Sequence, residues 1–432
     1  MSLYYILLLF TRFHSDPRVG MPLFHAAFVI VTPVKVIGLF TILAALATQR
    51  PTDASPRLRN SLGMVFFAFA TLQVLEVLAF GLPTPSASIS SLVSIGLLLL
   101  ATRALISTEE RMRKAVRVMI MTSAFASLWI FRQHFLEYAG PANGIEQDTN
   151  YESLTLVMGI PLAIWMVRYE TGSWWKRIGA VCAGLMAGGV LLTESRAGVI
   201  AAVVMGLVAV IVSRRKMLTL GLIAIAVAAG VVMAPAGLST RFHSIKLEGT
   251  ANNGDEVSTR THFELLKAGV AMIKSYPLTG VGLERFKDTA PAYNRELLQV
   301  AGHRFIAHDT YIQMAAESGL PVLILFLALM TMAFMNCRAV RRSANVPLAH
   351  MATAMQLGLI GFGIAAVSVT AEYVTTFWIL VFLSQNLREL AAFAAARVQP
   401  QVRRANQATT LVRALPRRAK LARTTASIGQ GR

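Results

Sequence analysis

The sequence predicts an all-α polytopic integral membrane protein with about twelve transmembrane helices. Hydrophobic residues make up 55% of the 432-residue chain and charged residues only 15%, and the mean hydropathy is +0.56. Apolar runs near the roughly 20 residues that cross a bilayer recur along most of the chain. A soluble chain of this length would hold about two or three domains. Spanning helices are instead expected to pack into one membrane domain.

The apolar runs give the expected spans in order. They lie at residues 2–14, 22–48, 61–82, 87–106, 115–135, 152–169, 176–193, 197–213, 217–235, 310–336, 350–370 and 372–394. The first run has no basic region before it and no small-residue cleavage site after it, so we expect an uncleaved span rather than a signal peptide. The chain then divides into nine spans within 1–235, a loop domain at 236–309, three spans within 310–394 and a basic tail at 395–432.

Lysine and arginine set the expected orientation, because positively charged short loops stay in the cytoplasm. Alternate loops are basic, as around Arg57, Arg113, Arg177, Arg215 and Arg341. With these loops inside, residues 236–309 fall on the outer face. Arg12 and Arg18 depart from the pattern, which leaves the number of N-terminal spans open.

The net charge of +19 is explained by this topology and by the tail, where anionic membrane lipids attract basic residues. We therefore expect membrane lipids and no nucleic acid as partners, with RNA binding by the tail as the weaker alternative. Cys182 and Cys337 lie far apart in or beside expected spans. Neither a disulfide framework nor a thiolate metal site is indicated.

The outer loop is long enough to fold, and its pattern predicts amphipathic helices. The first is marked by apolar residues at helical spacing: Phe263, Leu266, Val270 and Ile273. Arg260 precedes Phe263 by about one turn and is expected on the buried side, where a guanidinium requires an anion. A second amphipathic piece is expected at 283–300. The intervening Gly280-Val-Gly282 follows no strand and lacks a third glycine, which argues against dinucleotide binding.

His308 stands where this loop passes into the apolar run that begins at Thr310. Thr310 followed by Gln313 predicts a capping box, which places His308 at a helix N-terminus. The partial positive charge there attracts anions and lowers the pKa of an imidazole, so that it stays neutral and can accept a proton. A structural hydrogen bond is the plainer role for a lone histidine.

Arg196 lies in a short turn between two apolar runs, on the same expected face as His308 and Arg260. It could snorkel toward water or pair with Glu194. It could also clamp a phosphate with its planar guanidinium, which suits that geometry better than lysine does. One imidazole and two guanidiniums near one leaflet favour chemistry on an anionic, lipid-linked substrate.

The order of these residues resembles the O-antigen ligase and polymerase superfamily. The matching motifs are Ser195-Arg196-Ala-Gly198, Arg260 before an amphipathic helix, Pro277-Leu-x-Gly280-Val-Gly282-x-x-x-Phe286, His308-x-x-Tyr311 and Glu317-x-Gly319. At the level of motifs the resemblance covers about residues 190–325. Members usually have asparagine after the histidine, whereas this chain has Asp309.

The resemblance implies a membrane-embedded glycosyltransferase, an O-antigen ligase of the bacterial inner membrane with a periplasmic active site. Its donor would be O-antigen polysaccharide on undecaprenyl pyrophosphate and its acceptor the lipid A core oligosaccharide. His308 would act as general base. Arg196 and Arg260 would bind the pyrophosphate and assist catalysis, and Tyr311 would bind substrate. Because no carboxylate is placed as a covalent nucleophile, direct displacement would invert the anomeric carbon.

We expect no cofactor and no metal, because arginines already supply positive charge. The alternative is Mg²⁺ or Mn²⁺ held by Glu146 and Asp148. Other functions compete with the ligase: an O-antigen polymerase, a protein O-oligosaccharyltransferase and, outside the enzymes, a lipid-linked oligosaccharide flippase. Notable polar groups crowd one face, which favours surface chemistry over transport.

Overall fold

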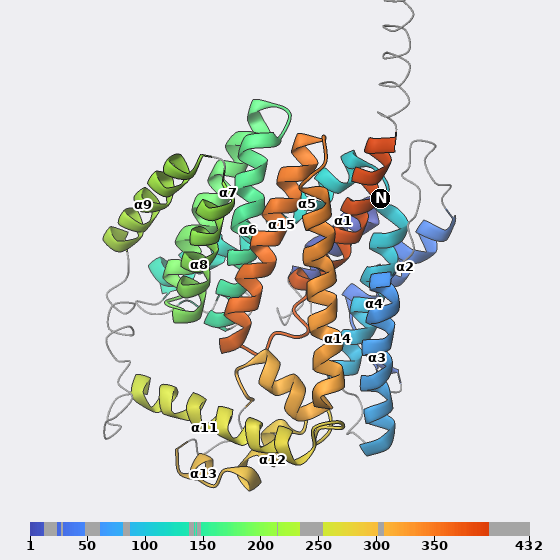
Figure 1. The fold of residues 1–432 in the computed structure, drawn as a ribbon, viewed down its shortest axis with the longest axis vertical. Helices are drawn as coiled ribbons and strands as arrows, with labels where there is room; N and C mark the ends of the chain where they lie inside the picture. Colours follow the sequence, from blue (N-terminus) through green and yellow to red (C-terminus); the bar gives the residue numbers. More distant parts are fainter. Residues whose placement is uncertain are drawn as a thin grey trace, which may run out of the picture.

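The computed structural model is almost entirely helical, which confirms the predicted polytopic fold. It describes residues 1–12, 24–26, 29–47, 61–80, 87–137, 142, 144, 148–213, 215–233, 254–300 and 306–396. Long helices run roughly along the vertical axis of Figure 1, and α11 (Gly254–Ser275) crosses one end of the bundle. The N-terminal part of the expected loop domain, at 236–253, and the tail from 397 lie outside the described residues.

The N-terminal segment departs from the expected spans at the second of its two apolar runs. Helix α1 (Ser2–Arg12) is short. The run 22–48, expected as one span, instead contains strands β1 (Phe24–Ala26) and β2 (Val29–Val31), which pair antiparallel, before α2 (Pro33–Ala47). The prediction of a single helix was wrong here. Consecutive β-branched side chains favour the strand, and proline at the first helical position starts α2 after it.

The remaining helices follow the apolar runs closely. The first group is α3 (Ser61–Phe80), α4 (Ala87–Leu105), α5 (Glu109–Arg132), α6 (Thr149–Tyr169), α7 (Ser173–Leu192), α8 (Arg196–Val212) and α9 (Lys216–Met233). After α11 come α12 (Phe286–Tyr293), α13 (Glu296–Val300), α14 (Thr310–Val340), α15 (Val346–Ala365) and a C-terminal helix, Thr375–Ala396. In the described residues, eight helices are long and apolar enough to cross a membrane. The count of about twelve stays a prediction.

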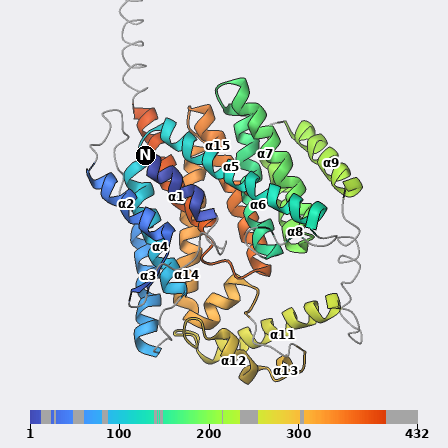
Figure 2. The ribbon, with the colours of Figure 1, turned by 180° about the vertical axis from the view of Figure 1, so that it is seen from behind.

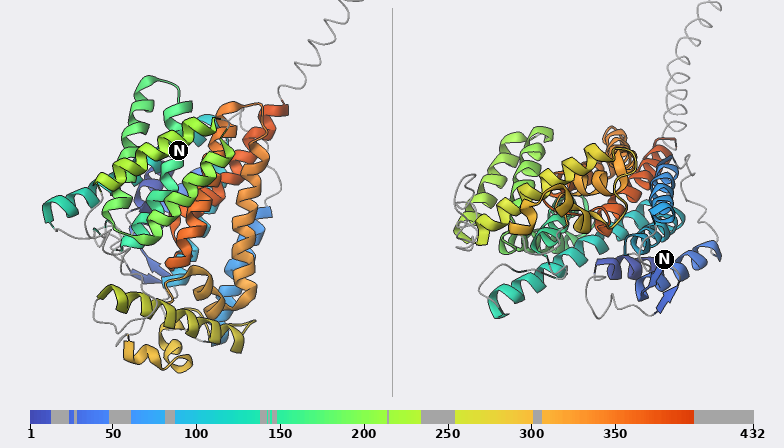
Figure 3. Two further views of the ribbon diagram at one scale, coloured as in Figure 1. Left: turned by 60° about the vertical axis from the view of Figure 1, so that its left-hand side comes forward. Right: turned by 90° about the horizontal axis from the view of Figure 1, so that it is seen from below.

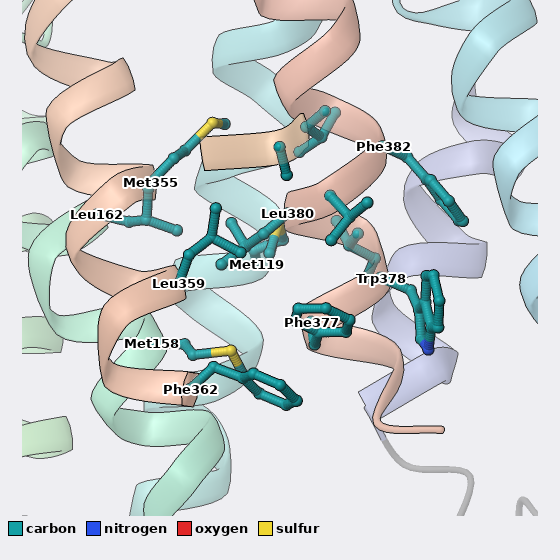
Figure 4. Close-up of a cluster of buried hydrophobic side chains, with 14 of the residues drawn as sticks. Met119, Met158, Leu162, Met355, Leu359, Phe362, Phe377, Trp378, Leu380 and Phe382 are labelled. Carbon is teal, nitrogen blue, oxygen red and sulfur yellow. The ribbon is translucent and has the colours of Figure 1, made fainter. Parts of the chain in front are cut away.

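The C-terminal helix lies at the centre of the bundle and carries much of its aromatic core. Phe377 stacks on Phe362 of α15 with ring centroids 4.0 Å apart, and Trp378 meets Phe326 of α14 and Phe66 of α3 edge-on. Figure 4 shows Phe362, Phe377 and Trp378 among buried methionine and leucine side chains. Close packing of this kind holds helices together where no hydrophobic drive acts between them. The aromatic contacts of Trp378 with Phe326 therefore fix the position of α14 in the bundle.

The described connections from α4 to α5, α6 to α7 and α14 to α15, which the sequence marks as basic, lie at the end of the bundle opposite to α11 (Figure 1). Arg117 of α5 donates two hydrogen bonds to the carboxylate of Glu170, which ends α6, at 3.0 and 2.5 Å. Asn345, before α15, donates to Glu109 at 3.1 Å. Viewed from behind in Figure 2, α1 and α5 lie side by side. Where the structure describes them, these basic connections share one end of the bundle; the loop around Arg57 lies outside the described residues.

Candidate functional site

The start of α8 is fastened to the start of α6. The Ser195 hydroxyl accepts a hydrogen bond from Gly198 N at 3.2 Å and donates to Asn150 Oδ1 at 2.6 Å. A Cβ on Gly198 would lie 2.4 Å from Ser153 Cβ, so only glycine allows this approach. The Ser-Arg-Ala-Gly motif thus supplies a cap, a cation and a contact point. It places Arg196 at the end of the bundle that faces α11.

Asp148 begins α6 beside this contact. Its carboxylate accepts hydrogen bonds from Asn150 N at 2.8 Å and Tyr151 N at 3.0 Å, so it is the N-cap. Its charge also acts on His308. Glu146, its partner in the metal alternative, lies outside the described residues. Within the described part of the chain, no group of three or more His, Cys, Asp or Glu residues is placed to hold a metal ion.

His308 occupies a strained turn immediately before α14, with a positive φ of 50°. The cap of α14 is Asp309, whose carboxylate accepts from Tyr311 N and Ile312 N, each at 2.9 Å. The predicted capping box of Thr310 was therefore wrong. The Thr310 hydroxyl donates to Val369 O at 2.6 Å instead. Asparagine at this position would cap the helix as well as aspartate does.

Gln313, the other member of the predicted capping box, holds the backbone immediately before His308 in place. Gln313 Oε1 accepts a hydrogen bond from Ala307 N at 2.8 Å, and its Nε2 donates to Glu317 Oε1 at 2.6 Å. Both Gln313 and Glu317 are buried. Buried hydrogen bonds on either side of His308 keep the turn in one conformation.

His262 of α11 lies against His308, with ring centroids 5.0 Å apart and the planes tilted by 60°. Burial, with the nearby charges of His308 and Arg196, lowers the pKa of His262 from 6.5 to about 4. Burial also lowers the pKa of His308, against the opposing charge of Asp148. Arg196, His262, His308 and Asp148 therefore form one cluster, and both imidazoles are neutral at pH 7.

His262 was not predicted from the sequence, because the apolar residues that mark the expected buried face of α11 lie outward. Arg260, expected on the buried side, is exposed, as is 52% of Phe263. The inward face is built from smaller or less regular residues: Thr261, Leu265, Ala268, Gly269 and Met272. A helix at a membrane surface can leave its most apolar face outward. Gly269 lies at the contact of α11 with α14, since a Cβ there would lie 2.3 Å from Ile312 Cγ2.

Arg260 and Tyr311 are not in the cluster as the structure stands. The charge of Arg260 acts on Glu264, one turn along α11. The Tyr311 hydroxyl donates to Gly363 O at 2.9 Å and so ties α14 to α15. Arg260 shares α11 with His262, two residues away. Their proposed roles toward substrate stay predictions.

The locked segment, residues 277–286, follows α11 and is hydrogen-bonded to a kink in α14. The kink is at Gly319, where φ is 76° and ψ is 170°. Three backbone hydrogen bonds cross the junction: Val281 N to Ala316 O at 2.9 Å, Gly282 N to Glu317 O at 2.8 Å and Leu320 N to Pro277 O at 2.8 Å. A Cβ on Gly280 would lie 2.1 Å from Glu317 O. Gly280 and Gly282 on one side and Gly319 on the other permit this close contact.

The buried Glu317 carboxylate completes the lock. It accepts hydrogen bonds from Glu284 N at 3.0 Å and Phe286 N at 2.9 Å. The Pro-Leu-x-Gly-Val-Gly and Glu-x-Gly motifs are therefore two halves of one junction. It fixes the domain that carries His262 and Arg260 relative to the helix that follows His308. Figure 3, seen from below, shows α11 lying across the bundle end.

Comparison with known proteins adds one finding. A family model described as O-antigen ligase matches residues 181–327. This stretch contains the Ser195-Arg196 turn, the locked segment and the start of α14. The match confirms the resemblance to the O-antigen ligase superfamily and supports a ligase or polymerase type of function in a multi-pass membrane protein. A search of curated proteins gave no match.

Proposed function

We propose that this protein is an O-antigen ligase of the bacterial inner membrane. It transfers O-antigen polysaccharide from undecaprenyl pyrophosphate to the lipid A core oligosaccharide at the periplasmic face. The cluster of Arg196, His262, His308 and Asp148 carries the proposal, because it joins a neutral base and a cation at one end of the bundle. The family match over the same region supports the substrate class.

In the proposed reaction, an acceptor hydroxyl oxygen attacks the anomeric carbon of the donor sugar. The bond from that carbon to the pyrophosphate oxygen breaks, and the anomeric centre inverts. His308 takes the hydroxyl proton, which its neutral imidazole can do at pH 7. Arg196 and Arg260 stabilise the negative charge that develops on undecaprenyl pyrophosphate. Neither ATP nor a metal ion is required, because the leaving group carries the energy.

The surroundings of His308 suit a base that must hold one orientation. His262 packs against its ring without adding a charge at neutral pH, since burial keeps His262 deprotonated. Asp148, acting from α6, favours the imidazolium that forms after proton transfer. Arg260 is exposed and can reach a bulky donor that approaches from outside.

The test is transfer in vitro by the purified protein, with undecaprenyl-pyrophosphate-linked O-antigen and lipid A core, in EDTA and without ATP. A glycan ladder on the core supports the ligase. Longer glycan on the lipid carrier with no product on the core would instead establish a polymerase, and glycosylated Ser or Thr of an added protein would establish an oligosaccharyltransferase. Activity only after Mg²⁺ addition would overturn the metal-independent mechanism.

Variants then assign the residues. His308→Ala should lower the transfer rate about 10²- to 10⁴-fold by removing the base, and Arg196→Ala about 10²- to 10³-fold by removing a charge-stabilising donor. The matched controls are Arg342→Ala, between α14 and α15, and His350→Ala, in the second turn of α15; both residues are exposed, and the connection from α14 to α15 lies at the end of the bundle opposite to α11 (Figure 1). Near-normal transfer by His308→Ala would remove it from the mechanism.

A further inference from the structure

A second polar site lies away from the His308 cluster, in a cavity of about 220 Å³ between α1, α2, α4 and the start of the C-terminal helix. One wall carries Lys35 of α2 and three serines of α4, Ser90, Ser91 and Ser94. The Lys35 ammonium donates a hydrogen bond to the Ser90 hydroxyl. A cation and several hydroxyl donors thus face the same space.

Much of the rest of the cavity wall is apolar, although Thr32, Tyr373 and Thr375 also line it. Leu7 of α1, Val34 of α2 and Ile95, Leu97 and Leu98 of α4 line it. Helix α2 also presents apolar side chains outward, with Leu39 50% and Phe40 57% exposed. In a membrane protein such residues face lipid tails. The cavity therefore combines a polar wall and an apolar wall beside a lipid-facing helix.

The polar wall lies toward the end of the bundle that carries α11. Ser88, two residues before Ser90, donates from its backbone N to Glu284 Oε1 of the locked segment at 2.7 Å. Tyr373, which also lines the cavity, donates to Gln73 Oε1 of α3 at 2.6 Å. Lys35 is accordingly near the membrane boundary on the same face as the His308 cluster, where lipid headgroups are.

We propose that this cavity binds the phosphate-bearing headgroup of a membrane lipid in the leaflet next to α11. An ammonium group binds phosphate as a compact point charge, and the serine hydroxyls donate to the remaining phosphate oxygens. The apolar wall receives the first carbons of the attached chains. The volume is below the roughly 300–1,000 Å³ of pockets that enclose a drug-sized molecule, so it fits a headgroup and not an oligosaccharide.

Native mass spectrometry of the full-length protein in detergent tests the site, with phosphatidic acid as the probe. Lys35→Gln should weaken one phosphatidic acid binding event about tenfold or more, because a hydrogen bond to a charged group is lost. Ser91→Leu should weaken the same event by filling the cavity while Lys35 is retained. Lys35→Arg and the distant exposed control Lys216→Gln should bind as the unmodified protein does.

Comparison of probes separates the sources of phosphate. Binding of phosphatidic acid that survives excess inorganic phosphate, with weaker binding of phosphatidylcholine, supports a lipid phosphate site. Full displacement by inorganic phosphate, or equal binding of phosphatidylcholine, would overturn the assignment. So would unchanged phosphatidic acid binding in both Lys35→Gln and Ser91→Leu. Because binding is measured without glycan transfer, the result is independent of the proposed enzymatic function.

Discussion

The junction between the locked segment and α14 can be broken by a single methyl group. Gly280 has a positive φ of 62°, and a Cβ there would lie 2.1 Å from Glu317 O and 2.6 Å from Ser318 N. The left-handed conformation costs an L-residue about 1–2 kcal/mol. The clash is with backbone, so the two segments must separate and lose at least two hydrogen bonds, each worth about 0.5–1.5 kcal/mol. Gly280→Ala should therefore destabilise the junction by about 2–5 kcal/mol.

Amide hydrogen exchange measures this locally. The N–H groups of Val281, Gly282 and Phe286 donate across the junction, and their exchange should become roughly thirtyfold to several thousandfold faster. Gly172→Ala is the matched control: φ is 97° there, but nothing lies within 4 Å of the added Cβ. It should leave these amides unchanged. Equal effects of the two variants, or exchange within a few-fold of the unmodified protein, would refute the steric argument.

Three further predictions follow from the same region. Burial holds the pKa of His308 below the ordinary imidazole value of about 6.5, so the transfer rate should be constant near neutral pH and fall only below about pH 6.5. Asp148→Asn keeps the cap of α6 but removes a negative charge that raises the pKa of His308. The pH–rate profile of this variant should therefore fall at a lower pH than that of the unmodified protein, and a fall at higher pH would contradict the role of Asp148. Asp309→Asn should leave the thermal unfolding midpoint unchanged, while Asp309→Ala should cost about 1 kcal/mol through loss of the cap, and equal midpoints would contradict that role. Glu317→Gln should destabilise the junction by about 1–3 kcal/mol, because the amide side chain cannot accept hydrogen bonds from both buried N–H groups. Amide hydrogen exchange of Glu284 and Phe286 should detect this effect. The peripheral control Glu137→Gln should leave their exchange unchanged.

Most of the spanning helices could be predicted from the sequence because hydropathy over about 20 residues is a local property. The observed bounds of α3, α4 and α6 lie within a few residues of the expected runs. The run 22–48 is the exception. Hydropathy reports that a run is apolar, but it does not separate strands β1 and β2 from the helix that begins at Pro33.

The candidate site was only partly predictable. Arg196 and His308 stood out because a charged or titratable side chain beside an apolar run is unusual. His262 did not, since the periodicity of α11 offers two faces and the more apolar one points away from α14. Even the neutral state of His308 was expected for a different reason, the helix end, whereas burial is the main cause.

The sequence by itself determined the membrane fold, the gathering of basic loops at one end and the short motifs of the family, because each depends on composition or on neighbours along the chain. Only the tertiary structure decided that Asp148, Arg196, His262 and His308 meet, and that the glycine motifs of two distant segments form one lock. Those contacts join residues tens of positions apart along the chain, and Asp148 and His308 are 160 positions apart. Their geometry is set by how α6, α8, α11 and α14 pack, and no local pattern encodes it.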